Sequence, residues 1–188
     1  MRKILYFVDE TGKDVSAKSY IVSVVMSERA QHLESICQHY EHVSKKYSRS
    51  WNDASPIRRL EYLRRVIDDP RFIGKLHFWQ IENPKSSLFD AYTIQAIIST
   101  ISQISNVSSA EVYVDALSIK KQSEYSIAIR RSGIRSTRLH RATDDAFPLV
   151  RLADAVAGLT RDVFEDGETE ATRLFYRGVS KGVIIRVR

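Results

Sequence analysis

The sequence is poor in the residues that interrupt regular structure. It has seven glycines and four prolines among 188 residues, and no Gly/Ser-rich or single-residue tract suggests a long disordered linker. With 43% hydrophobic side chains, the chain is long enough for one domain that buries roughly 70% of its unfolded surface. We therefore predict that residues 1–188 form a single domain.

Cysteine and long apolar runs are also scarce. Cys37 is the single cysteine, so no intramolecular disulfide can form, which suits a reducing, intracellular setting. Arg2 and Lys3 precede apolar residues as in a signal peptide, but Asp9 and Glu10 end that run and no small-residue cleavage site follows. No run approaches the roughly 18 apolar residues of a membrane span. The sequence predicts a cytoplasmic protein with no membrane partner.

Acidic residues are outnumbered by basic ones. The chain has 29 Lys and Arg against 23 Asp and Glu, a formal net charge of +6. This excess favours an anionic partner such as nucleic acid, either DNA or RNA. A modest positive charge is also common among globular proteins, so the partner has to be argued from particular residues.

Hydrophobic periodicity indicates an α/β protein. Short runs rich in β-branched and aromatic residues predict strands, and apolar residues at helical spacing predict helices. Ser27 is expected to cap the first helix, whereas Pro56 and Pro148 each occupy a first helical position. The five expected strands are 3–9, 19–26, 72–82, 110–117 and 134–141. Two further segments are a helical excursion at 27–69 and a C-terminal extension at 167–188, whose residues 181–188 could add an edge strand.

The order of these elements matches the ribonuclease H-like arrangement, with a central mixed five-stranded sheet flanked by helices. In that fold the first strand pairs with an antiparallel meander on one side and with the parallel fourth and fifth strands on the other. Asp9 ends the first strand in "YFVD", and Asp115 ends the fourth in "VYVD". We therefore expect these two acids to emerge from neighbouring strands.

Two carboxylates at matched ends of adjacent parallel strands lie where α/β sheets bind ligands. They repel each other, so one pKa rises unless a cation sits between them. Mg²⁺ and Mn²⁺ prefer oxygen ligands, and the sequence has no Cys/His cluster that would suggest zinc. The strand ends therefore predict a site for Mg²⁺ or Mn²⁺ at Asp9 and Asp115.

A third acid, Asp154, lies on the expected helix "FPLVRLADAVAGLTR". It falls at the border of the apolar stripe, so a helix packed on the sheet could point it along the sheet's rim. Ala157 and Gly158 are small enough for a close approach, and a mid-helix glycine needs a reason to offset its cost of about 1 kcal/mol. The alternative is a solvated acid flanked by Arg151 and Arg161.

Three short segments carry a family resemblance. "VDETG", "VYVDAL" and "LADAVAG" resemble the bacterial family called domain of unknown function 3800. Its members look like ribonuclease H-fold proteins with an Asp-Glu-Ser-Gly motif on the first strand, a central strand Asp and a Gln-x-Ala-Asp-x-x-Ala-Gly helix. The resemblance implies that the catalytic acids are Asp9, Glu10, Asp115 and Asp154.

The sequence departs from that pattern at two positions. Thr11 replaces the usual Ser, which is a mild change, and Arg151 stands where the family often has Gln. An Arg one helical turn before Asp154 either pairs with that acid or contacts a phosphate. This leaves metal occupancy and substrate choice open.

The chemistry that Asp9, Asp115 and Asp154 would serve with Mg²⁺ is in-line hydrolysis of a phosphodiester, with two metal ions about 3.5–4 Å apart. Glu10 is either a ligand or orients one. Asp144 and Asp145, just before the last long helix, either supply a ligand or cap that helix.

Several basic and aromatic residues are candidates for contact with nucleic acid. Basic side chains neutralise phosphates, although on helices they are often simply the solvated face. Aromatic side chains stack on bases, although core packing competes for them, and a strand histidine either transfers a proton or is structural. The basic candidates are Lys120, Lys121, Arg151 and Arg161; the others are Trp51, Trp79, Tyr113, His77 and His140.

Two hypotheses of function remain. The first is a metal-dependent nuclease or related phosphodiester hydrolase. The second is a non-catalytic ribonuclease H-like module that binds nucleic acid or protein, in which the acids serve structure or regulation. PIN-like nucleases also place acids at strand ends, and they differ from the first hypothesis in topology.

Overall fold

The computed structural model describes residues 3–14, 17–104, 109–134, 137–143, 145–167 and 170–187. The strands are β1 (Lys3–Thr11), β2 (Ser19–Ser27), β3 (Leu76–Glu82), β4 (Ser109–Asp115), β5 (Thr137–Ala142) and β6 (Ile184–Arg186). The helices are α1 (Ala30–Val43), α2 (Pro56–Asp68), α3 (Phe89–Ser102), α4 (Ile119–Arg131), α5 (Pro148–Asp166) and α6 (Glu170–Ser180), with short 3₁₀ turns η1 (Pro70–Phe72) and η2 (Ser86–Leu88).

The sheet has the strand order β5-β4-β1-β2-β3-β6. β1 pairs antiparallel with β2 and parallel with β4, and β4 pairs parallel with β5. This is the meander-plus-parallel topology expected from the element order. The expected count of five strands is wrong, because β6 of the C-terminal extension pairs parallel with β3 and makes a sixth.

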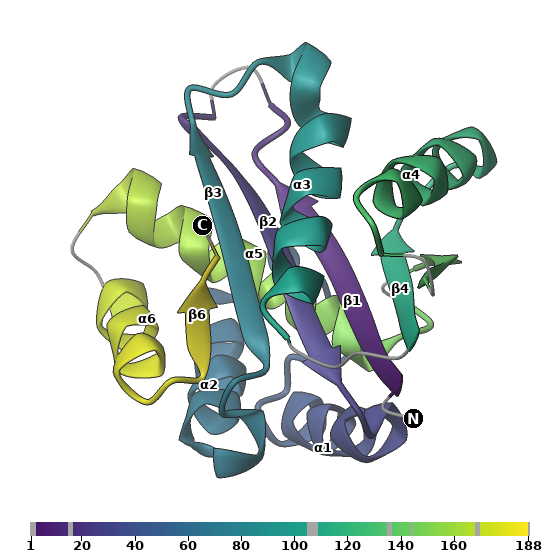
Figure 1. The fold of residues 1–188 in the computed structure, drawn as a ribbon. Coiled ribbons are helices and arrows are strands. Elements are labelled where there is room, and N and C mark those ends of the chain that lie inside the picture. The colour runs from purple at the N-terminus through teal and green to yellow at the C-terminus, as the bar shows by residue number, and fades with distance from the viewer. Residues whose placement is uncertain are drawn as a thin grey trace.

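Helices cover both faces of the sheet (Figure 1). Because successive side chains of a strand point to opposite faces, β1 contributes to two cores. Phe7 joins side chains of α1, α2, α5 and α6, whereas Tyr6 and Val8 join those of α3 and α4. The longest helix, α5, packs across β1 and β2, which places Asp154 on the Phe7 face.

Helix boundaries follow local chemistry where a proline begins the helix. α2 and α5 begin at Pro56 and Pro148 as expected. The expected cap at Ser27 is wrong, because Ser27 is the last residue of β2 and α1 begins at Ala30 after Arg29. The Ser27 hydroxyl instead accepts a hydrogen bond from the Arg29 N–H at 3.0 Å, within the turn that joins the two elements.

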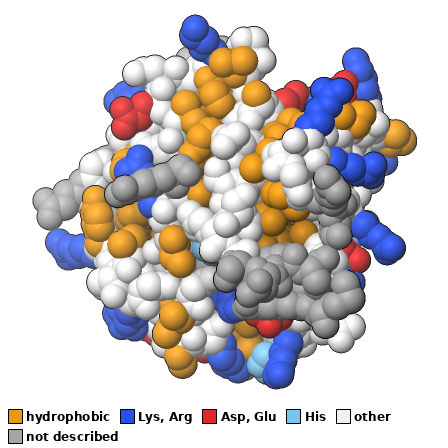
Figure 2. Space-filling view, viewed as in Figure 1, with side chains coloured by type: hydrophobic (Ala, Val, Ile, Leu, Met, Phe, Trp, Pro, Cys, Tyr) orange, Lys and Arg blue, Asp and Glu red, His pale blue; other side chains and the backbone are white. Residues whose placement is uncertain are grey.

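The face shown in Figure 2 has no single large patch of one charge sign. Lys and Arg side chains are spread around its margin, and hydrophobic side chains are visible between α3 and α4. Across the described part of the chain, no helix is both long and apolar enough to cross a membrane.

Candidate functional site

Asp9 and Asp115 lie at matched ends of two paired strands. The parallel register aligns Phe7 with Tyr113 and Val8 with Val114, so the next residues along the two strands are the two acids. By strand alternation both side chains share the face of Phe7, on which α5 packs. The prediction that these acids emerge side by side is thus met by the register.

The Asp9 carboxyl group is desolvated and surrounded by negative charge. Burial raises the pKa of Asp9 well above its usual value, and the charges of Asp154, Glu10 and Asp115 raise it further. One hydrogen bond opposes this effect, because the Glu10 N–H donates to Asp9 Oδ1 at 2.7 Å. Carboxylates of β4 and α5 therefore lie close enough to Asp9 on β1 to act on its charge, although the three come from distant segments of the sequence.

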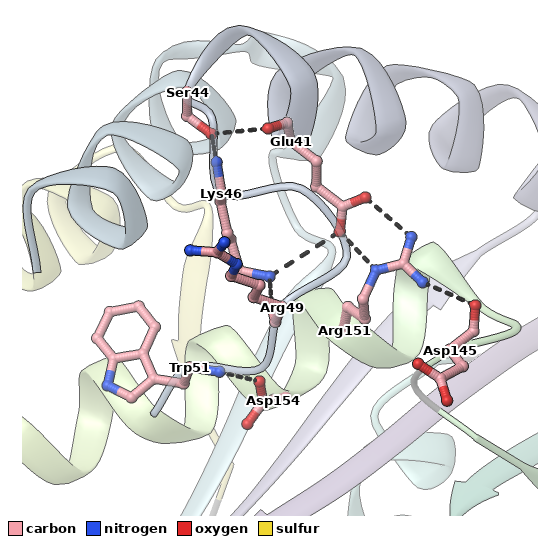
Figure 3. Close-up of polar contacts among 8 residues, drawn as sticks. All are labelled: Glu41, Ser44, Lys46, Arg49, Trp51, Asp145, Arg151 and Asp154. Atoms are coloured by element: carbon pink, nitrogen blue, oxygen red, sulfur yellow. Dashed lines mark hydrogen bonds and ion pairs between the residues drawn. The ribbon is translucent and has the colours of Figure 1, made fainter. Parts of the chain in front are cut away.

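Asp154 is held by a backbone group of the connection between α1 and α2, which we call the 44–55 segment. The Trp51 N–H donates to Asp154 Oδ2 at 2.6 Å (Figure 3). Asp154 also lines a cleft of about 330 Å³. The other lining residues are Thr11, Trp51, Asn52, Gly158, Arg161, Asp162 and Glu165. Asp154 is therefore a positioned acid at a surface cleft rather than a solvated residue of a helix face.

Gly158 lets the 44–55 segment lie against α5. A Cβ atom at Gly158 would lie 2.3 Å from ring atoms of Trp51, which is shorter than any van der Waals contact. Trp51 is 2% exposed, and the Arg59 guanidinium lies 4.4 Å from its ring centroid. The mid-helix glycine thus serves a tryptophan contact, and Trp51 packs in the protein rather than facing a base.

Glu10 points to the other face of the sheet. Strand alternation places it with Tyr6 and Val8, toward α3 and α4. Its Oε1 accepts a hydrogen bond from Lys13 Nζ, and its charge raises the pKa of both Tyr20 and Tyr125. Glu10 adds to the field at Asp9, but its side chain lies on a different side of the sheet from Asp154.

Arg151 is buried and forms an ion pair with Glu41. Its Nε and Nη2 donate to the two carboxylate oxygens of Glu41 at 2.7 and 2.8 Å (Figure 3), and both side chains are 5% exposed. A bidentate pair of this kind satisfies two charges that would be costly to bury alone. The Arg at this position therefore fixes α5 to α1.

Lys46 completes the same buried network. It is fully buried, with Nζ 4.0 Å from Glu41 Oε1 and donating to the carbonyl oxygen of Arg49. The Tyr62 ring lies 5.2 Å from Nζ. Lys46 thereby ties the 44–55 segment to α1 and α2, and that segment carries the Trp51 N–H to Asp154.

Asp145 lies just before α5 and contacts a residue of that helix through its backbone. The carbonyl oxygen of Asp145 accepts a hydrogen bond from Arg151 Nη1 at 3.2 Å. The N-cap residue of α5 is Phe147, which makes no side-chain cap hydrogen bond, so Asp145 lies two residues before the cap position. Asp144 lies outside the described residues.

The remaining basic candidates lie at the surface. Lys120 is exposed on the first turn of α4. Lys121 pairs with Asp90 at 2.8 Å. Arg161 pairs with Asp14 at 2.8 Å and with Glu165 at 2.9 Å, and it is the one predicted basic residue that lines the Asp154 cleft.

The donor chemistry at Asp9 fits a hard divalent cation. All of the groups that raise the Asp9 pKa electrostatically are carboxylates, and a cation would relieve both their repulsion and the desolvation of Asp9. Within the described ranges, no three His, Cys, Asp or Glu side chains already form a metal-binding group. The residue types are therefore suitable ligands for Mg²⁺ or Mn²⁺. Binding of the ion would bring the carboxylates closer together than they lie in this structure.

Other aromatic and histidine candidates fall into two groups. His77 is 4% exposed on β3, and burial lowers its pKa; Trp79 packs edge-on against Tyr92. These are structural positions. Tyr113 and His140 lie instead on β4 and β5, on the same face as the acids.

The order and direction of the strands, with helices on both faces, define a ribonuclease H-like fold. Comparison with solved structures agrees: the chain is similar to ribonuclease H2 from Pyrococcus horikoshii OT3, with 12% identity, a TM-score of 0.57, and coverage of 92% of this chain and 84% of that one. It is also similar to a chain of the PCNA:RNase HII complex from Archaeoglobus fulgidus, with 15% identity, a TM-score of 0.58, and coverage of 96% and 91%. No protein-family profile and no curated protein matches the sequence.

Proposed function

We propose that this protein is a divalent-metal-dependent nuclease or related phosphodiester hydrolase that acts on nucleic acid through Asp9, Asp115 and Asp154. The observation that carries the proposal is the desolvated Asp9 carboxyl group, whose pKa is raised by the charges of Asp115 on the neighbouring strand and Asp154 on α5. Mutually repelling acids at the carboxyl ends of neighbouring strands are more typical of a functional site than of a protein interior.

The similarity to ribonuclease H2 and ribonuclease HII structures supports a nuclease. At 12% and 15% identity the similarity is evidence for the fold alone, so the argument for nuclease activity depends on the acids. The resemblance to domain of unknown function 3800 supports the same residues, because its three motifs match Asp9, Asp115 and Asp154.

Mg²⁺ or Mn²⁺ bound by these acids would supply an activated water and charge stabilisation for in-line displacement at phosphorus. The chain's own contribution is to hold the acids in place. The paired ends of β1 and β4 fix Asp9 and Asp115, the Trp51 N–H fixes one oxygen of Asp154, and packing of α5 on the sheet keeps that side chain at the same edge. Glu10 adds negative charge from the opposite face.

The alternative is a non-catalytic nucleic-acid- or protein-binding module on the same fold. One observation favours it: no three metal-ligating side chains of the described residues are already grouped. The two functions differ in what Asp9→Asn does, because only the enzyme loses its activity while the fold is kept.

A cleavage assay tests the proposal. Labelled single-stranded RNA, single-stranded DNA, RNA–DNA hybrid and duplex DNA are incubated with the protein in Mg²⁺, Mn²⁺ or EDTA. We expect metal-dependent cleavage of at least one substrate, lost in Asp9→Asn and Asp115→Asn. Glu82→Gln is the matched control. Glu82 is also an acid at the last position of a strand, β3, where it pairs with Ser19, but its side chain is exposed.

Absence of cleavage by the unmodified protein on all four substrates, together with salt-dependent binding that survives Asp9→Asn, would support the binding module instead.

A further inference from the structure

Three parallel-paired strands carry a row of aromatic side chains, and two of these strands carry an acid of the site two residues further along. The register aligns Phe7 of β1 with Tyr113 of β4 and His140 of β5. We call these three residues the aromatic row. Two residues further along each strand, on the same face, come Asp9, Asp115 and Ala142.

The rings of the aromatic row are stacked on one another. The ring centroids of Phe7 and Tyr113 are 5.1 Å apart with an interplanar angle of 14°. Those of Tyr113 and His140 are 4.6 Å apart with an angle of 18°. The inner ring is buried, with Phe7 1% exposed, whereas the His140 side chain is 38% exposed. The row therefore starts in the core and ends at the surface.

A hydrogen bond orients the middle ring, that of Tyr113, and stacking aligns the outer ring, that of His140. The Tyr113 hydroxyl donates to Glu111 Oε2 at 3.2 Å, and His140 Nε2 lies 3.7 Å from the same oxygen. Glu111 is in turn paired with Lys3 at 2.9 Å. The hydrogen bond turns the hydroxyl of Tyr113 toward Glu111, and the His140 ring is aligned by its stacking on Tyr113.

The outer side of His140 lies at the sheet's edge. β5 is the terminal strand in the sheet order, so among the described residues no strand lies beyond it on that side of the ring, and α5 packs mainly across β1 and β2. An aromatic ring with one face stacked and the other toward the edge is a surface on which a planar, π-rich group can stack. Nucleobases are such groups.

The aromatic row lies between the acids of the proposed site and a basic residue, and we call the surface from Asp115 past His140 to Arg138 the strip. On one side, two residues along the strands and thus roughly 6.6 Å away, are the acids of the proposed site. On the other side, Arg138 faces the same way as His140. Arg138 also lines a hollow of about 610 Å³ with Arg130 and with the Lys3–Glu111 ion pair, so the two arginines are the cations that a phosphate group would find there.

We propose that this strip binds a single-stranded nucleic-acid segment, with an unpaired base stacked on His140 and a backbone phosphate near Arg138. The proposal deepens the proposed function and rests on it, because a strand that runs along the strip from Arg138 past His140 leads a phosphate further along to Asp9 and Asp115. A paired base is covered on its stacking faces by its neighbours in the duplex, so the strip selects unpaired nucleotides.

Fluorescence anisotropy in EDTA tests this binding without cleavage. The probes are fluorescein-labelled oligo-dT and oligo-rU of about 12 nucleotides, a length within the site sizes of single-strand-binding folds, and an oligomer of the same length made of abasic units. We expect tighter binding of the probes that carry bases. His140→Ala should weaken their binding on the order of tenfold and leave the abasic probe unchanged, whereas His140→Phe should preserve it.

A matched control is His39→Ala, which removes another exposed histidine ring next to a tyrosine, Tyr40, on α1. It should leave all affinities unchanged. Arg138→Gln should weaken all three probes equally and reduce the salt dependence of binding by about one phosphate contact.

The proposal is overturned if His140→Ala and the unmodified protein discriminate equally between base-carrying and abasic probes. That result would leave the nuclease assignment intact, because cleavage depends on Asp9 and Asp115. Conversely, normal His140-dependent binding with no metal-dependent cleavage would overturn the nuclease and keep the strip as a single-strand-binding surface.

Discussion

At the scale of single residues, Asp9 is an acid in an environment that is unfavourable for its charged form. Its carboxyl group is buried beside Asp154 and Asp115, and each of these conditions favours the protonated form. A fold selected for stability alone would not retain such an acid, because an uncharged residue would remove the repulsion. Strain of this kind is expected where a site is built for a ligand.

Asp9→Asn should therefore stabilise the metal-free protein in a pH-dependent way. Because the folded-state pKa of Asp9 is raised above the usual 3.8, the folded protein binds an extra proton between these two values. Its stability relative to Asp9→Asn should fall as pH rises through that window. Each kcal/mol corresponds to about 2–4 °C in melting temperature for a chain of this size. Thermal unfolding in EDTA at a series of pH values measures the difference, and a difference that does not change with pH would contradict the account.

Arg151 shows the opposite case, a charge retained for structure. Arg151→Met should destabilise the protein by about 3–5 kcal/mol, because Glu41 is left buried without its bidentate partner. Lys46, 4.0 Å from Glu41, should keep the loss toward the lower end. Urea unfolding measures the change.

Arg161→Met is the control for that experiment. Arg161 makes two ion pairs but is 26% exposed, so its loss should cost about 0–1 kcal/mol. Equal destabilisation by the two substitutions would show that the Glu41–Arg151 pair is not the anchor that the geometry indicates.

At the scale of helices and strands, the sequence predicted the features that depend on neighbouring residues alone. The strands, and the starts of α2 and α5 at Pro56 and Pro148, follow from residue type and proline geometry. The start of α1 was missed, because Ser27 has the chemistry of a cap but is kept in β2 by pairing with β1. The contacts of the 44–55 segment were also missed, since the Trp51 N–H reaches Asp154 across 103 positions of sequence and no periodicity encodes that contact.

Gly158 was the one sequence cue to that segment, and its substitution tests the packing. Helix propensity alone predicts that Gly158→Ala stabilises α5 by about 1 kcal/mol. We expect destabilisation instead, because the new Cβ would lie 2.3 Å from the Trp51 ring and would push the 44–55 segment away from Asp154. In a Trp79→Phe background, Trp51 fluorescence should shift to the red as its ring becomes more exposed.

Gly178→Ala in α6 is the matched control. A Cβ there meets the terminal methyl of Ile184 at 2.7 Å, which a rotation of that flexible side chain can relieve, so Trp51 emission should not change. A stabilised Gly158→Ala protein with unchanged Trp51 emission would show that the segment does not depend on the glycine.

At the scale of the whole molecule, the parallel pairing of β1 with β4 and the packing of α5 across the sheet assemble the candidate site. The order of strands and helices predicted this topology, and with it the proximity of Asp9, Asp115 and Asp154. The sixth strand was counted only as a possible edge, because β6 has three residues and depends on pairing with β3 rather than on its own sequence. The net charge of +6 located no interface, since basic residues such as Arg151 and Lys46 serve the interior.

The most direct test of the central claim is calorimetric titration of Mn²⁺ into the unmodified protein, Asp9→Asn and Asp154→Asn, with folding checked by circular dichroism. If acids from β1 and α5 share one metal site, the unmodified protein and the Glu82→Gln control should bind Mn²⁺, and both Asp variants should fold but lose that binding. Unchanged binding in the folded Asp variants, or no binding by the unmodified protein even with nucleic acid present, would contradict the metal site and with it the proposed nuclease.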